Sequence, residues 1–99
     1  MKLIIDLNSF YSAGDERRFF QGLSENPSVS GFRGIARQLE VTIVQRRLGR
    51  DALWELTALF QRYQIPLAPL AQLAKQERFA WLTDETWSWH ESMFPPTAP

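Results

Sequence analysis

The chain has 99 residues, of which 44% are hydrophobic and 22% are charged, and its formal net charge is zero. This composition excludes an intrinsically disordered chain, because it offers enough apolar surface for a core and no net charge that opposes compaction. The absence of cysteine excludes a disulfide scaffold, a thiol nucleophile and a thiolate metal site. The length suits one domain, which we expect over residues 1–94, followed by a frayed proline-rich tail over 95–99.

The N-terminal sequence does not predict a membrane or export signal. Its first apolar run is interrupted at Asp6, which is too early for the core of a signal peptide. No stretch reaches the roughly 20 apolar residues that a membrane helix needs. We therefore expect a cytoplasmic protein that has no membrane partner.

Two elements are predicted before the first proline. Residues 2–8 alternate apolar and polar side chains, and this period of two predicts a half-buried strand, with a turn at residues 8–9. Ser12 is a candidate N-cap for a helix. That helix should end by Asn26, because a proline disfavours helical geometry in the residue before it. Residues 27–34 are rich in Ser and Gly and are expected to form a loop.

The middle of the chain predicts a strand and then the clearest helix of the sequence. Residues 37–45 again alternate apolar and polar side chains, and residues 48–50 are expected to form a turn. Asp51 is a good N-cap, and the apolar residues after it recur at steps of three and four until Pro66 stops the helix. A strand–helix–strand unit of this length predicts a crossover that joins parallel neighbours.

The last third of the chain predicts helices and leaves one segment open. A further helix is expected to begin at Pro69, since proline is tolerated at the first helical position. Residues 78–82 fit either a continuation of that helix or a third strand, and residues 83–85 fit the cap of a short terminal helix. We predict an α/β or α+β fold: a single small domain with a two- to three-stranded sheet packed by two or three helices, in the order β-α-β-α-α-(β)-short α.

The sequence contains no recognisable catalytic or cofactor motif. Its glycines are scattered outside any phosphate-binding loop, and His90 is the only imidazole. The acidic pairs at residues 15–16 and 84–85 are explained by helix N-termini, where negative charge is favoured. The segment Gly31-Phe32-Arg33-Gly34 has the GxxG spacing of some RNA-binding modules without their context. We therefore predict no enzyme activity, no cofactor, no catalytic residues and no metal ligands.

The region most suggestive of function is the aromatic and acidic stretch over residues 81–94. Trp87 and Trp89 are two positions apart, so a helix would turn them about 200° from each other and could not bury both on one narrow face. Exposed aromatic rings beside carboxylates are typical of a surface that binds a basic partner. The alternative is that this segment folds back onto the core and buries both indoles. The candidate partner-binding residues are Trp81, Asp84, Glu85, Trp87, Trp89, His90 and Glu91.

A second candidate surface is the arginine-rich segment over residues 31–50. It carries five arginines against one acidic residue, Glu40, which leaves a local charge of +4. Such a cluster could contact the phosphates of a nucleic acid. Arg46 and Arg47 are neighbours on the predicted strand and point to opposite faces, so the other interpretation is a solvated strand end with local ion pairs. The candidate anion-binding residues are Arg33, Arg37, Arg46, Arg47 and Arg50.

One short segment resembles a known family. Asp51-Ala52-Leu53-Trp54-Glu55-Leu56 resembles the Asp-Ala-Leu-Trp-Asp helix segment of the barstar family, small ribonuclease inhibitors with a three-stranded parallel sheet. The resemblance covers about ten of the 99 residues. The stretch before it departs from the family, because it lacks the Tyr-Tyr-Gly loop and has a predicted strand where barstar has none. The resemblance implies an inhibitor function and carries no site residue over to this chain.

Together these patterns favour a non-catalytic protein-binding module. We expect an inhibitor or immunity-type protein that binds a basic, nuclease-like partner through the acidic and aromatic surface of residues 81–91. The alternative is a nucleic-acid-binding protein that uses the arginines of residues 33–50. An edge strand in so small a sheet could also pair with a second copy, so a homodimer is a further expectation.

Overall fold

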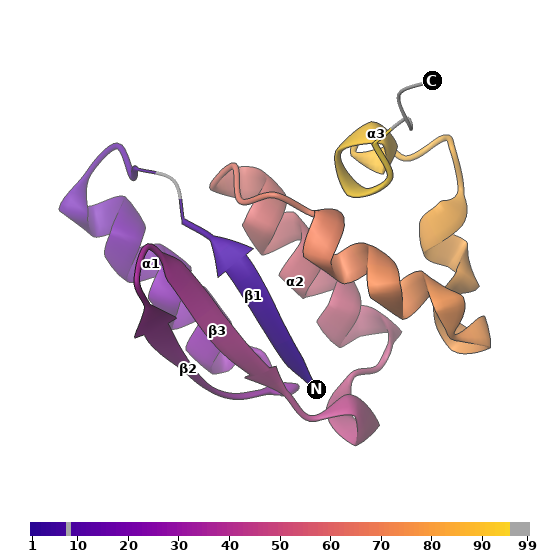
Figure 1. The fold of residues 1–99 in the computed structure, drawn as a ribbon, viewed down its shortest axis with the longest axis horizontal. Coiled ribbons are helices and arrows are strands. Elements are labelled where there is room, and N and C mark those ends of the chain that lie inside the picture. Colours follow the sequence, from indigo (N-terminus) through magenta and orange to yellow (C-terminus); the bar gives the residue numbers. More distant parts are fainter. Residues whose placement is uncertain (8, 96–99) are drawn as a thin grey trace.

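The computed structural model describes residues 1–7 and 9–95, so the expected turn at residues 8–9 and most of the expected proline-rich tail lie outside the described residues (Figure 1). The elements form one small α+β domain with a three-stranded sheet, as the fold class predicted. In chain order they are β1 (Lys2–Asp6), α1 (Ala13–Glu25), β2 (Val29–Ile35), β3 (Gln38–Ile43), the 3-10 helix η1 (Gln45–Arg47), α2 (Arg50–Arg62), the 3-10 helices η2 (Ala68–Lys75) and η3 (Glu77–Thr83), and α3 (His90–Met93).

The sheet is antiparallel, and its strand order is β1-β3-β2. Ile5 of β1 lies opposite Leu39 of β3, and Phe32 of β2 lies opposite Val41 of β3. The predicted pairing of parallel neighbours across the first helix is therefore wrong. β1 and β2 do run in the same direction, but the antiparallel strand β3 lies between them. Since β1 and β2 are the two edges of this sheet, pairing with a second copy stays a prediction.

Strand β2 is the element that the sequence analysis missed, since residues 27–34 were expected to form a loop. It contains two glycines, and most of its side chains are exposed, so it lacks the alternation that identified the other strands. Pairing with β3 outweighs this weak local signal, because strand formation depends strongly on cross-strand context. The hairpin turn includes Ala36, a non-glycine residue with φ 54°, which gives no turn signal of its own.

The helix α1 has the predicted boundaries, whereas α2 and the strand before it are shifted. Ser12 caps α1, and its hydroxyl accepts a hydrogen bond from the Asp15 backbone N–H at 3.1 Å. Gly49, not Asp51, is the N-cap of α2, and Asp51 lies in the first turn, where its charge still favours the helix dipole. β3 ends at Ile43, so residues 45–47 form η1 and not the end of a strand.

The C-terminal third is built mainly from 3-10 helices. The helix expected at Pro69 is η2, and residues 78–82 lie within η3, so the strand alternative for that segment is wrong. The expected short terminal helix is limited to α3, and residues 84–89 form turns before it. This difference from the predicted helix decides how the tryptophans of that segment pack.

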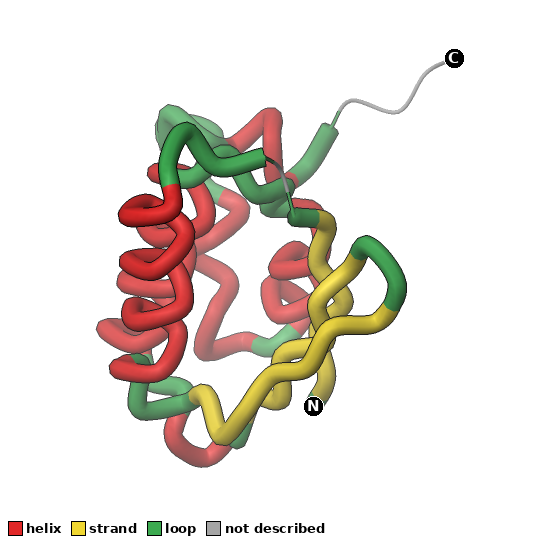
Figure 2. The backbone as a smooth tube through the Cα atoms, turned by 90° about the vertical axis from the view of Figure 1, so that its left-hand side faces the viewer, coloured by secondary structure: helices red, strands yellow, loops and turns green. Residues whose placement is uncertain are grey.

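The core lies between one face of the sheet and the helices. Figure 2 shows the helices on one side of the strands and open space on the other. Alternate residues of β1 and β3 meet side chains from α1, α2 and the C-terminal segments in one buried cluster: Leu3, Ile5, Leu39, Val41, Ile43, Phe19, Leu23, Leu53, Leu56, Phe60, Leu70, Leu73, Phe79, Leu82, Trp89 and Met93 among them. Within the described ranges, no helix is long and apolar enough to cross a bilayer.

Candidate functional site

The acidic and aromatic residues predicted to bind a partner gather around one hollow on the surface. This hollow has a volume of about 540 Å³ and is formed by the turns after η3 together with α3. We call it the acidic hollow; it is lined by Glu85, Trp87, Ser88, His90, Glu91 and Phe94. Four of the seven predicted residues therefore lie in its wall. The other three, Trp81, Asp84 and Trp89, lie beside or beneath it.

Asp84 fixes the turn that carries the wall of the acidic hollow. Its carboxylate accepts hydrogen bonds from the Thr86 backbone N–H at 2.9 Å and from the Thr86 hydroxyl at 2.7 Å. These two bonds hold the pKa of Asp84 below its usual value. Partial burial raises this pKa, and the nearby His90 lowers it by a smaller amount. Asp84 therefore stays ionised and orders the chain that leads into Trp87.

Trp87 and Trp89 stack on each other instead of diverging. Their ring centroids are 5.5 Å apart and their planes differ by 9°. The helical argument for exposing one of them does not apply, because both residues precede the first residue of α3, His90. Trp89 is 6% exposed and belongs to the core, whereas Trp87 is half-buried and lies at the surface of the stack.

All four tryptophans of the chain form one cluster, which supports the acidic hollow from below. Trp54 of α2 has its ring centroid 4.9 Å from that of Trp87 and 5.9 Å from that of Trp81. The Trp87 indole N–H donates to the Trp81 carbonyl oxygen at 2.9 Å, and the Arg50 guanidinium lies 4.9 Å from the centre of the Trp81 ring. These contacts fix the orientation of Trp87.

Trp54 is the surface residue that sequence reasoning missed. It is 40% exposed and contacts Trp87, so it extends the aromatic surface beside the acidic hollow. The available signal was its place next to the apolar stripe of α2, at a position that the stripe itself does not bury. That signal could not indicate that η3 and the turns after it bring the other indoles to the same face of α2.

The carboxylates around the acidic hollow have no lysine or arginine partner in the described part of the chain. Asp84, Glu85 and Glu91 are exposed, and none of them makes an ion pair with another residue in the described part of the chain. The sequence after Arg78 contains no further lysine or arginine. Across residues 1–7 and 9–95, no group of three or more histidine and carboxylate side chains could hold a metal ion. The hollow is therefore suited to a cation that can contact an indole ring and a carboxylate together.

The five predicted anion-binding arginines do not form one surface. Arg33 points to the open face of the sheet, where its Nε lies 3.1 Å from a carboxylate oxygen of Glu40. Arg37 lies in the hairpin turn before β3, and η1, which contains Arg46 and Arg47, follows the other end of β3. A six-residue strand is roughly 20 Å long. Arg50 lies over Trp81. The nucleic-acid alternative therefore stays a prediction to which this geometry adds no support.

Comparison of the chain with protein-family models, with curated proteins and with solved structures gives no significant match in any of the three. The antiparallel sheet also differs from the parallel sheet that the barstar resemblance implied. That resemblance is therefore limited to residues 51–56, which lie in α2.

Proposed function

We propose that the protein is a non-catalytic binding module whose acidic hollow receives a basic side chain of a protein partner. The observation that carries this proposal is the pair of exposed carboxylates, Glu85 and Glu91, that lines the hollow with the half-buried ring of Trp87 and makes no ion pair in the described part of the chain. A lysine or arginine entering the hollow would pair with carboxylates that make no ion pair in the described part of the chain, and it would meet the face or edge of an indole.

The rigidity of the tryptophan cluster supports this role. Trp87 is held by its hydrogen bond to Trp81 and by its stack on Trp89, so little side-chain freedom remains to be lost on binding. A preorganised ring at a surface binds more tightly than a mobile one for that reason. Trp54 adds exposed aromatic area beside it, and aromatic residues of this kind are enriched at the centres of protein interfaces.

An inhibitor or immunity-type role follows if the partner's basic residues belong to its own active site. Nucleases need cationic side chains to hold phosphates, and an acidic surface that covers those side chains would block the substrate. We therefore propose a basic, nuclease-like protein as the class of partner.

The test uses a hexa-arginine peptide as the probe and measures its affinity by isothermal titration calorimetry. We expect Glu85→Gln/Glu91→Gln to weaken binding about tenfold, because two exposed charges in direct contact with the probe are lost. The matched control is Glu16→Gln/Glu25→Gln, which removes the same charge from exposed positions on α1 and should leave the affinity within about twofold.

Two results would contradict the proposal. Equal weakening by the test and control variants would indicate that the peptide senses only overall charge. An unchanged affinity in the Glu85→Gln/Glu91→Gln variant would place the contact elsewhere on the surface.

A further inference from the structure

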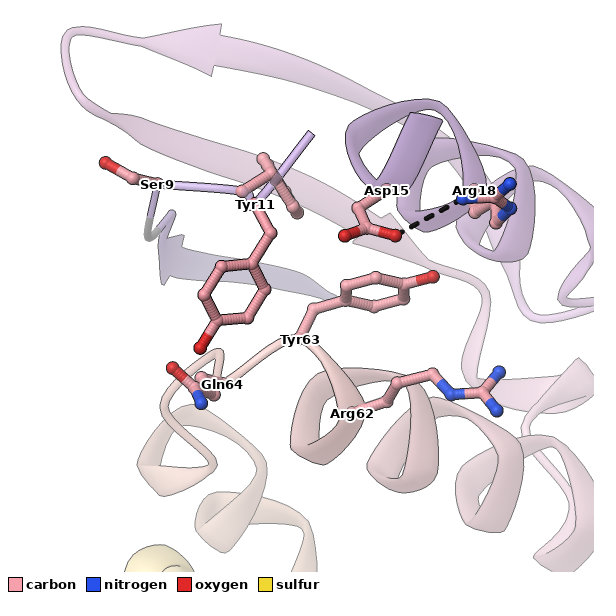
Figure 3. Close-up of a pocket in the computed structure, with 8 residues that line it drawn as sticks. Ser9, Tyr11, Asp15, Arg18, Arg62, Tyr63 and Gln64 are labelled. Carbon is pink, nitrogen blue, oxygen red and sulfur yellow. Dashed lines mark hydrogen bonds and ion pairs between the residues drawn. The ribbon is translucent and has the colours of Figure 1, made fainter. Parts of the chain in front are cut away.

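A separate cavity lies at the C-terminal end of α2, away from the tryptophan cluster, and the proposed function makes no use of it. It has a volume of about 370 Å³ and is formed by the segment before α1, the first turns of α1 and the end of α2 (Figure 3). A space of this size matches pockets that hold small molecules. Aromatic rings and arginines line it, together with Ser9, Asp15 and Gln64.

The aromatic part of the cavity combines a packed ring with one that is largely exposed. Tyr63 packs against Phe19 with ring centroids 5.8 Å apart and against Phe10 at 6.0 Å. Tyr11, in contrast, is 90% exposed although it is a large aromatic residue. Figure 3 shows the rings of Tyr11 and Tyr63 lining the same space. A planar ligand could contact both the packed ring of Tyr63 and the exposed ring of Tyr11.

The charged part of the cavity carries one surplus cation. Arg18 makes an ion pair with Asp15, with 3.3 Å between Nη1 and Oδ1. Arg62, on the facing helix, makes no ion pair with any residue that the structure describes. Its guanidinium is therefore available for a carboxylate or a phosphate, which it can contact through two N–H groups at once.

Gln64 also lines the cavity, and its backbone conformation is unusual for a residue with a side chain. It is the second residue after α2, and its φ of 60° is in the left-handed region that favours glycine. The backbone closes the helix there, with the Ile65 N–H donating to the Phe60 carbonyl at 2.8 Å. A glycine would fit this backbone better, yet the chain keeps a side chain that lines the cavity. Strain retained at one position is typical of functional sites.

We propose that this cavity binds a small planar aromatic anion, whose ring lies against Tyr11 and Tyr63 and whose carboxylate or phosphate is held by Arg62. Gln64 forms part of the wall beside Tyr63 and is therefore placed to contact the ligand. This assignment is independent of the acidic hollow, because the two places share no residue.

The test titrates the full chain with 4-hydroxybenzoate, phenyl phosphate and inorganic phosphate, followed by nuclear magnetic resonance chemical shifts. We expect saturable binding of at least one of the two aromatic anions, and the comparison between them distinguishes a carboxylate ligand from a phosphate ligand. Arg62→Gln should weaken that binding at least about tenfold, because a charge-assisted bidentate contact is lost. Arg62 is exposed, so this variant should fold.

Gln64→Gly separates binding from stability. We expect this change to weaken binding of the aromatic anion, because a lining side chain is lost. We also expect Tm to rise by about 4 °C, because glycine adopts the left-handed backbone conformation without strain. Ala36→Gly is the matched control: Ala36 is the other described non-glycine residue with positive φ, and it lies in the β2–β3 turn outside the cavity. It should raise Tm similarly and leave the affinity unchanged.

Three results would overturn the proposal. These are the absence of saturable binding of both aromatic probes, binding of inorganic phosphate as tight as that of phenyl phosphate, and an affinity that neither Arg62→Gln nor Gln64→Gly changes.

Discussion

Glu40 connects all three strands on the open face of the sheet. Its carboxylate lies 3.1 Å from the Arg33 Nε of β2 and 3.3 Å from the Lys2 Nζ of β1. Partial burial raises the pKa of Glu40, but the hydrogen bonds and charges of these two cations outweigh that effect and hold the pKa below its usual value of 4.5. The glutamate on the central strand thus links both edge strands through their side chains.

The lowered pKa predicts how stability depends on pH. A carboxyl group whose pKa is lower in the folded state stabilises fully above its unfolded pKa, and the effect is lost as the pH falls through the folded pKa. We expect Glu40→Gln to lower Tm at neutral pH, and the gap between variant and wild type to shrink well below pH 4.5. Thermal unfolding followed by circular dichroism across this range measures the gap.

The control for that experiment is Glu55→Gln, an exposed change in the middle of α2 at a residue that makes no ion pair in the described ranges. Its Tm should follow the wild type at every pH. A gap between Glu40→Gln and wild type that stays constant from neutral to acidic pH would show that the charge of Glu40 does not stabilise the sheet.

Individual residues also mark the limits of sequence-based reasoning about the sites. The acidic and aromatic character of residues 81–91 was predictable, and the buried Trp89 agrees with the alternative in which this segment folds back onto the core. The sequence could not decide between the two alternatives, because the packing depends on turns that replace the expected helix. The cavity beside Arg62 had no sequence signal: its walls come from segments about 50 residues apart, and the left-handed residue at the end of α2 is a glutamine, not the usual glycine.

At the scale of the elements, a regular spacing of apolar residues was enough to predict β1, α1, β3 and α2 from the sequence. Each has apolar residues at a spacing that only one kind of element can bury, so tertiary context and local preference agree. β2 was missed because two glycines and exposed side chains remove the period. The 3-10 helices η2 and η3 were predicted as helical or ambiguous, since short segments with buried leucines and aromatics do not distinguish these forms.

The contact between α1 and α2 gives an element-scale prediction. A Cβ added at Gly22 of α1 would lie 2.8 Å from Leu59 Cδ1 of α2, which is closer than two carbons can pack. Replacing a glycine inside a helix by alanine gains about 1 kcal/mol from helix propensity alone. We expect Gly22→Ala to gain little or nothing in the wild type and to show most of that gain in a Leu59→Ala background.

A double-mutant cycle measured by urea unfolding tests this expectation. The double variant should be more stable than the sum of the two single effects predicts, because the clash exists only when alanine replaces Gly22 while Leu59 is still present. The same change in unfolding free energy in both backgrounds would mean that Leu59 moves aside at no cost.

For the whole molecule, the C-terminal segment is part of the core and not an appendage. Trp89 is 6% exposed and Met93 is 1% exposed, and both belong to the same buried cluster as the inner face of the sheet. We expect Trp89→Ala to lower the free energy of unfolding by about 3–5 kcal/mol, as large-to-small changes of buried aromatic residues do. Urea unfolding followed by far-ultraviolet circular dichroism measures this loss.

Trp54→Ala provides the comparison, because this ring belongs to the same cluster but is 40% exposed. Trp54→Ala should lower the free energy of unfolding clearly less than Trp89→Ala does. A similar, small loss in both variants would indicate that the segment after η3 packs only loosely on the rest of the domain.

The placement of the aromatic residues along α2 has a spectroscopic consequence. The four tryptophans gather around Trp54, and the two tyrosines of the chain, Tyr11 and Tyr63, lie at the cavity at the C-terminal end of the helix. Trp54 and Tyr63 are about 14 Å apart along the helix axis. Each of the two surfaces therefore carries its own chromophore. Selectively excited indole emission reports on the acidic hollow, and tyrosine difference absorption reports on the cavity. Binding at both surfaces can therefore be measured on one unlabelled sample.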